Sequence, residues 1–181
     1  MKTQFNVPQR KEVSAKNQNL FDEMQKTLHQ VPNLYATFAY SENALGAYLA
    51  VENAPTSLNP REVEAVNLVV SQVNQCVYCL SAHRIVAKSK GFNEEEIAEL
   101  RTGKASFDPK LNALVHLAKS ATEQRGHIDP ALMDPFFAAG YTKENLIDTI
   151  MLVGIRTITN IQHAITKVPV DFALAPELKT A

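Results

Sequence analysis

The sequence lacks the features that mark several large classes of protein. It has only two cysteines and no tryptophan, and its 18 Lys and Arg residues are balanced by 19 Asp and Glu residues, which gives a formal net charge of -1. Two cysteines are too few for a disulfide-rich secreted fold. The balanced charge provides no basic surface for nucleic acid or for an acidic membrane. We therefore expect neither nucleic acid nor a membrane among the partners.

Long apolar runs are missing as well. Residues 1–16 are polar and lack the apolar centre of a secretory signal. No stretch reaches the roughly 18 apolar residues that a membrane helix needs, because the most apolar region, 146–158, is interrupted by Asp148, Arg156 and several threonines. We therefore expect a cytoplasmic protein in a reducing compartment. With 181 residues, the chain is long enough for one well-buried core.

Helix signals recur along the chain, whereas strand and hairpin signals do not. Asn59 and Pro60, followed by a glutamate at the third helical position, form a capping sequence, and Asn93 followed by three glutamates repeats it. Glycines then mark helix ends. The patterns predict helices over 15–30, 34–40, 42–52, 60–73, 74–90, 93–103, 108–126, 129–140 and 142–166. We expect a single all-α domain, a helical bundle over residues 1–181 with a frayed tail after Pro169.

Both cysteines lie in one short segment, Cys76-Val77-Tyr78-Cys79. Such a pair closes too small a loop to stabilise a fold, so a catalytic or metal-binding role is more typical of it in a reducing compartment. On a helix that turns about 100° per residue, Cys79 lies about 60° and His83 about 20° from Cys76. The first cysteine falls in the opening turn, where the helix dipole favours a thiolate. One face therefore carries two thiols and an imidazole.

Glu64 belongs to the preceding helix, whose valines indicate that it is mostly buried. A half-buried carboxylate needs a partner, and His83 on the next helix is a suitable one. A glutamate–histidine pair would orient the imidazole so that it acts as a base toward a thiol.

These four residues reproduce the Glu-x11-Cys-x2-Cys-x3-His signature, so the sequence resembles the AhpD-like superfamily, which includes the carboxymuconolactone decarboxylase family and the peroxidase-related proteins. The pattern S-x-x-N-x-C-x-Y-C, which begins at residue 71, is similar to the peroxidase-related branch. The resemblance is good over residues 35–117 and looser over 160–172. It implies an AhpD-like helical bundle that assembles as a trimer or hexamer.

The resemblance also implies a role for each residue. Cys79 matches the cysteine that attacks a hydroperoxide and becomes a sulfenic acid, and Cys76 matches the cysteine that resolves it as a disulfide. His83 and Glu64 match a proton relay. The best-studied branch has a histidine immediately before the second cysteine, whereas this sequence has Tyr78, which we expect to form part of the pocket wall. An external dithiol protein, thioredoxin-like or lipoyl-bearing, would restore the thiols, and no organic cofactor or metal is needed.

The apolar helix predicted over 142–166 suggests a buried core helix or the contact of a homo-oligomer. Within it, Arg156 needs an acidic partner, and we expect an intersubunit salt bridge. His163 lies further along the same helix, and we expect it at a subunit contact, at the helix end or beside the pocket.

Two alternatives to a thiol peroxidase remain open. The first is a lyase or isomerase that acts on a small lactone, as in the carboxymuconolactone decarboxylases, although that arm commonly lacks the cysteine pair. The second is a non-enzymatic module that senses redox state or a metal. Cys76, Cys79 and His83 would supply three zinc ligands, and Glu64 or His163 the fourth.

Overall fold

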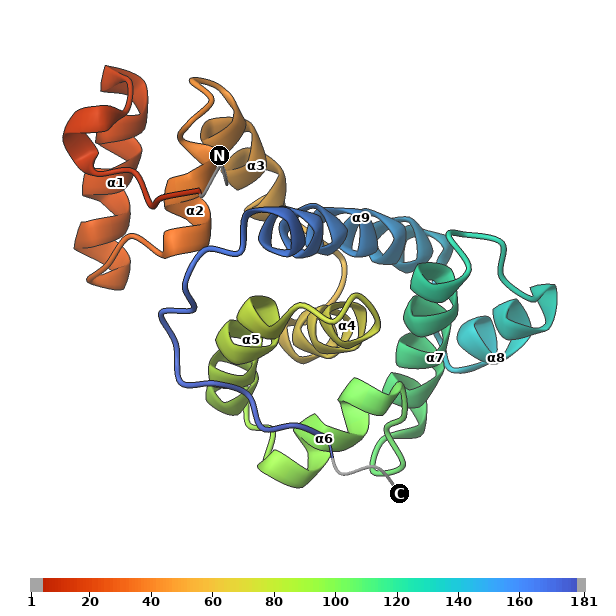
Figure 1. Ribbon diagram of the computed structural model, residues 1–181. Coiled ribbons are helices and arrows are strands. Elements are labelled where there is room, and N and C mark those ends of the chain that lie inside the picture. The colour runs from red at the N-terminus through yellow and green to blue at the C-terminus, as the bar shows by residue number, and fades with distance from the viewer. Residues whose placement is uncertain (1–4, 179–181) are drawn as a thin grey trace. The chain divides into compact units, whose positions relative to one another are not determined.

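The computed structural model describes residues 5–178, and every regular element within that range is a helix (Figure 1). Contacts between Cα atoms divide the chain into two compact units. The first unit comprises the residues up to Ala54 together with Gln162–Asp171. The second comprises Pro55–Ile161 together with the residues from Phe172 onward. The all-α prediction is confirmed, while the prediction of a single domain stays a prediction.

The first unit is a small helical cluster. Its elements are the 3-10 helix η1 (Arg10–Glu12) and the helices α1 (Ala15–Leu28), α2 (Asn33–Phe38) and α3 (Ala44–Glu52). Phe21, Met24 and Leu45 are buried at its centre. The Asp171 carboxylate accepts a hydrogen bond of 2.7 Å from the Asn33 backbone N–H and so caps α2.

The second unit is built around α4 (Pro60–Val73), which Figure 1 shows among its neighbours. The helices α5 (Val77–Ser89), α6 (Glu94–Thr102) and α7 (Pro109–Glu123) pack against α4. They are followed by η2 (Pro130–Leu132), α8 (Met133–Ala138) and α9 (Lys143–Thr166), of which the part up to Ile161 belongs to this unit. Nine of the fourteen residues of α4 are buried, so this helix forms the core on which the other elements are placed.

Capping explains why the sequence pattern predicts the start of α4 correctly. The Asn59 side chain accepts hydrogen bonds from the N–H groups of Arg61 at 2.9 Å and Glu62 at 3.0 Å, and the Glu62 carboxylate accepts one of 2.8 Å from the Asn59 N–H. These bonds satisfy amide groups that have no partner inside the helix. The same arrangement opens α6 at Asn93.

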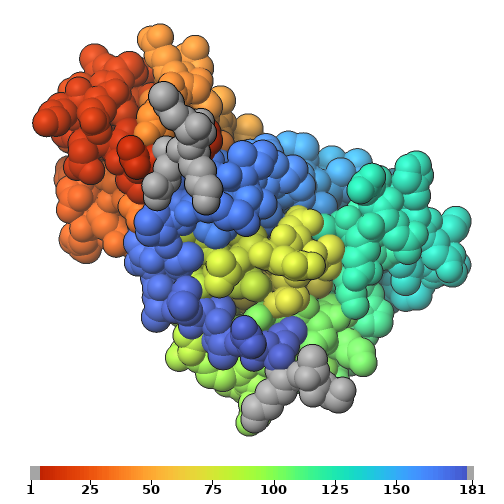
Figure 2. Space-filling model, in the orientation of Figure 1, coloured from red at the N-terminus to blue at the C-terminus, as the bar shows by residue number. Residues whose placement is uncertain are grey.

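The predictions missed some details. The helix expected over 129–140 is two short elements, η2 and α8, and η1 was not predicted. The segment from Phe172 to Leu178 is irregular, as expected, but it is not frayed, because Ala175 N–H donates to Ser81 at 3.0 Å and Arg101 donates to the Pro176 carbonyl at 2.8 Å. Figure 2 shows this segment on the surface of α5 and α6. No helix among residues 5–178 is both long and apolar enough to cross a membrane.

The α4 cap gives a first testable prediction. Replacing Asn59 with alanine removes the acceptor for two N–H groups, so we expect Asn59→Ala to lower the free energy of unfolding by about 1 kcal/mol. Urea unfolding followed by circular dichroism measures this change. Asn59→Asp retains a capping oxygen and should unfold close to the parent protein. Equal losses in the two variants would contradict a stabilising role for the cap.

Candidate active site

Two consecutive helices carry the four predicted catalytic residues. Glu64 lies on α4, Cys79 and His83 lie on α5, and Cys76 is the residue immediately before α5. The tight turn between the helices places Gln75 in the left-handed region, with a φ of 53°. This reversal directs α5 back along α4, and it brings groups that are up to 19 residues apart into contact.

The two cysteines are free thiols in direct contact. Their Sγ atoms lie 2.7 Å apart, and the Cys79 backbone N–H donates to the Cys76 sulfur at 3.3 Å. Cys76 was expected inside the opening helical turn. It lies one position earlier, as the extended N-cap residue of α5, with φ -86° and ψ 92°. Its sulfur therefore takes the place of the oxygen that usually caps a helix.

The two thiols are not equivalent. A hydrogen bond from Cys76 lowers the pKa of Cys79, burial opposes this effect, and the charges of Arg156 and His83 and the Asn160 amide lower the pKa further, to about 6. The pKa of Cys76 is raised, because its hydrogen bond to Cys79, its burial and the neighbouring thiolate all favour its protonated form. The more acidic thiol is therefore Cys79 and not Cys76, although the place of Cys76 at the start of the helix was expected to favour a thiolate there.

The glutamate–histidine pair expected from the sequence is present. His83 Nδ1 lies 2.8 Å from one Glu64 carboxylate oxygen, and the Asn67 amide donates to the other at 3.0 Å. Burial alone would raise the pKa of Glu64, but His83, Asn67 and the charge of Arg156 outweigh it and hold the pKa below its ordinary value. Glu64 is thus a buried, ionised group that orients the imidazole.

The helix α9 contributes polar residues that the sequence analysis did not assign to the site. Arg156 Nε donates to the Asn67 oxygen at 3.0 Å. One turn later, the Asn160 amide group donates to Ser71 at 3.4 Å and accepts a bond of 2.9 Å from Asn74. Its effect on both cysteines is to favour the ionised form. Arg156 thus has a hydrogen-bond partner within the chain, and its expected intersubunit salt bridge stays a prediction.

A signal for these contacts does exist in the sequence. Asn67, Ser71 and Asn74 are spaced so that they share one face of α4, and Arg156 and Asn160 share one face of the otherwise apolar α9. Two polar stripes on apolar helices indicate that the helices face each other through those stripes. The pairing of the two helices was still not predictable, because the bonded residues lie 86 to 89 positions apart.

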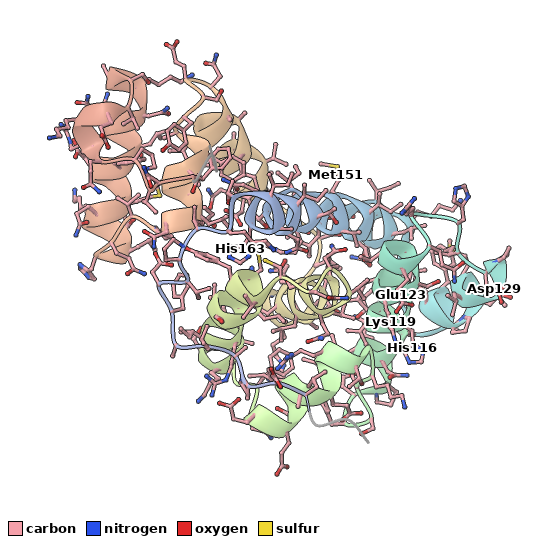
Figure 3. All side chains as sticks on the ribbon, viewed as in Figure 1. His116, Lys119, Glu123, Asp129, Met151 and His163 are labelled. Atoms are coloured by element: carbon pink, nitrogen blue, oxygen red, sulfur yellow. The ribbon has the colours of Figure 1, made fainter. Side chains whose placement is uncertain are left out.

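The two predicted pocket residues have different surroundings. Tyr78 is buried and packs edge-on against Phe172, with ring centroids 5.4 Å apart. His163, in the last turns of α9 (Figure 3), belongs to the first unit, within which its Nε2 lies 3.2 Å from the Val168 carbonyl oxygen. Burial lowers the pKa of His163. Their places in a substrate pocket stay predictions.

The sulfur site is closely enclosed. Cys76 and Cys79 are each 2% exposed. Their neighbours in the α4–α5 turn, Gln75 and Val77, are exposed to solvent, so the thiols lie just beneath the surface. Among residues 5–178, no group of three or more His, Cys, Asp or Glu side chains could hold a metal ion. The arrangement is chemically suited to two-electron thiol–disulfide exchange, because it combines a thiolate, a second thiol and an imidazole.

Comparisons with known proteins bear on the family and on the fold. A model of the carboxymuconolactone decarboxylase family matches residues 39–120, a range that contains all four site residues. A structure of a peroxidase-related protein from Ralstonia eutropha JMP134, described as an alkylhydroperoxidase AhpD core, superposes with a TM-score of 0.83 at 19% identity and covers 93% of this chain and 92% of its own. The chain therefore contains a segment similar to the carboxymuconolactone decarboxylase family, and it has an AhpD-like fold.

Two further structures share the AhpD-like fold. A peroxidase-related protein from Silicibacter sp. TM1040 has a TM-score of 0.80 at 22% identity, and the match covers 96% of this chain and 92% of that one. The debrominase Bmp8, in complex with 2,3,4-tribromopyrrole as a C82A variant, has a TM-score of 0.76 at 17% identity and covers 94% of this chain and 93% of its own. No curated protein matches the sequence significantly. These likenesses establish the fold of this AhpD-like chain.

The buried Glu64 gives a second prediction. Because its pKa is depressed in the folded state, its ionised form contributes stability that is fully present above the unfolded value of 4.5 and is lost as the pH falls through the folded value. We expect Glu64→Gln to lower the free energy of unfolding by about 1–3 kcal/mol at pH 7. The difference from the parent protein should shrink below pH 4.5.

Urea unfolding at pH 7 and at pH 3.5 tests this linkage. Glu95→Gln on the exposed surface of α6 is the matched control, and its difference from the parent should be small at both pH values. If Glu64→Gln lowers the free energy of unfolding by the same amount at both pH values, ionisation of the carboxylate contributes nothing to stability.

Proposed function

We propose that this AhpD-like protein is a thiol-dependent oxidoreductase of the peroxidase-related branch, which reduces small hydroperoxides. The observation that supports this proposal most directly is the contact between two free thiols of unequal pKa beside a Glu64–His83 pair. The same four residues carry the resemblance to the superfamily. The roles follow from their chemistry, with Cys79 as nucleophile, Cys76 as resolving thiol, His83 as proton carrier and Glu64 as the group that orients it.

The first step is a nucleophilic displacement. The Cys79 thiolate attacks the terminal oxygen of the hydroperoxide, the O–O bond breaks, and the alkoxide leaves as an alcohol after it takes a proton from His83. Cys79 becomes a sulfenic acid.

The second step closes the disulfide. The Cys76 thiol transfers its proton to His83 and attacks the Cys79 sulfur, and the hydroxyl group leaves as water. Two electrons pass from the thiols to the peroxide. The Sγ–Sγ distance of 2.7 Å means that little movement is needed to reach the bonding distance of about 2.05 Å.

The enclosure of the sulfurs favours a small substrate. Both cysteines are 2% exposed, so a compact hydroperoxide would reach Cys79 with less displacement of the surrounding side chains than a bulky one. The disulfide is then reduced by an external dithiol, for which a thioredoxin-like or lipoyl-bearing protein is suitable. The scheme needs no organic cofactor.

Homo-oligomer formation, as a trimer or hexamer, is part of the proposal. The surface of α9 exposes a row of large apolar side chains, among which Figure 3 shows Met151 pointing outward. The row consists of Ile147, Ile150, Met151, Ile158 and Ile161. A contiguous apolar surface of this kind is typical of a subunit contact. A cytoplasmic, reducing setting suits the free thiols.

The cysteine roles can be separated by substitution. In the reduced parent protein, one equivalent of hydroperoxide should remove both free thiols, as counted with a thiol reagent under denaturing conditions. Cys79→Ser should reduce peroxide consumption to background, because the nucleophile is gone. Cys76→Ser should consume one equivalent, form a sulfenic acid that a dimedone-type reagent traps, and stop. Full peroxide turnover by Cys79→Ser would refute the assignment.

The low pKa of Cys79 predicts the pH dependence of the first step. The thiolate is populated above its pKa of about 6, so the rate of the first turnover should rise about tenfold per pH unit below that value and level off above it. Stopped-flow mixing of the reduced protein with hydroperoxide measures the rate. A midpoint near 8.5, the value of an ordinary thiol, would show that Cys79 is not activated.

The likeness to Bmp8 adds a second candidate substrate for the same thiols. A thiolate that attacks a ring bromine, with protonation of the ring carbon, gives a sulfenyl bromide, from which the second thiol displaces bromide to form the disulfide. Bromide release from a bromopyrrole, absent in Cys79→Ser, would support this activity.

Turnover of a small lactone by a double Cys→Ser variant would instead favour a lyase or isomerase of the decarboxylase kind. One tightly held zinc per chain in untagged protein would favour a metal-sensing module.

A further inference from the structure

Arg156 is a buried cation that is hydrogen-bonded to Asn67, a partner of Glu64. Its side chain comes from a helix whose neighbouring residues are largely apolar, and the residue is 4% exposed. An unpaired buried charge is strongly unfavourable, so its retention in such a place requires compensating groups. Those groups lie at the candidate active site.

Arg156 lies at the end of a hydrogen-bonded chain that leads to the imidazole. Arg156 Nε donates to Asn67 at 3.0 Å, the Asn67 amide donates to Glu64 at 3.0 Å, and Glu64 lies 2.8 Å from His83 Nδ1. The guanidinium also interacts electrostatically with two anionic groups, the Glu64 carboxylate and the Cys79 sulfur.

We propose that Arg156 is a positioning residue of the thiol reaction, which holds the Asn67–Glu64–His83 chain in place and supplies a permanent positive charge that stabilises the Cys79 thiolate. This inference rests on the proposed thiol chemistry, and it adds a third helix, α9, to a site that the sequence signature confines to α4 and α5.

The type of cation matters for this role. Cys76, His83 and Arg156 are charged or titratable groups that act on Cys79, and the Glu64 carboxylate is bonded to His83. An imidazole changes its charge near neutral pH, whereas a guanidinium stays charged at every pH at which a protein is folded. Arg156 therefore supplies a positive charge to the site whether or not His83 is protonated.

The test measures the titration of Cys79 directly. In a Cys76→Ser background a single thiol titrates, and its thiolate absorbs at 240 nm. Removing a nearby positive charge should raise the pKa of Cys79 by about one unit, so that the thiolate fraction below that pKa falls about tenfold. We expect this shift in Arg156→Gln. If Arg156→Gln does not fold, Arg156→Met is used in its place. Methionine is apolar and of similar length, and this variant removes the same charge.

Two further variants separate charge from structure. Arg156→Lys keeps the charge but loses the planar guanidinium, and it should leave the pKa of Cys79 closer to the parent value than Arg156→Gln does. Lys143→Gln removes one positive charge from the exposed first turn of the same helix and should leave the pKa unchanged. Equal shifts in the lysine and glutamine variants, or no shift in either charge-removing variant, would overturn the proposal. Because the absorbance needs no peroxide, failure of the peroxidase proposal alone leaves this titration unaffected.

Discussion

The structure around the thiols depends on one buried carboxylate. Glu64 lies inside the core of the second unit, where an ionised group is unfavourable unless other groups compensate its charge. The compensation comes from three helices, because His83 lies on α5, Asn67 on α4 and Arg156, which acts through Asn67, on α9. Misplacing any of these helices would leave a buried charge without partners. The carboxylate therefore restricts how the helices pack.

Local signals in the sequence explain most of the fold. Helix α4 begins at the predicted Pro60 because Asn59 and Glu62 form their capping bonds, and it ends at the predicted Val73. The Glu64–His83 pair was also predictable, because both residues lie on consecutive helices at a spacing that a short turn fixes. Resemblance to a known signature, rather than periodicity, identified which cysteine is the nucleophile in the proposal.

Other parts of the site depend on information that local patterns do not contain. The pairing of Arg156 with Asn67 joins residues 89 positions apart. The exact start of α5 was misplaced because periodicity does not distinguish an N-cap residue from the first helical residue, so Cys76 was assigned to the helix that it caps. The C-terminal segment has no helix signal, yet its contacts with Ser81 and Arg101 hold it on the second unit.

The charges around Cys79 have a consequence for electron transfer. Arg156 and Glu64 are one cation and one anion. In the proposed reaction, the Cys79 thiolate and the proton that His83 donates form a second such set. In the proposed reaction, oxidation removes the negative charge of the sulfur. A site with so little exposure to water tolerates a net charge poorly, so electroneutrality requires the imidazole to release its proton as the sulfur loses its charge. In the proposed reaction, electrons and protons therefore leave this site together, and neither transfer is independent of the other.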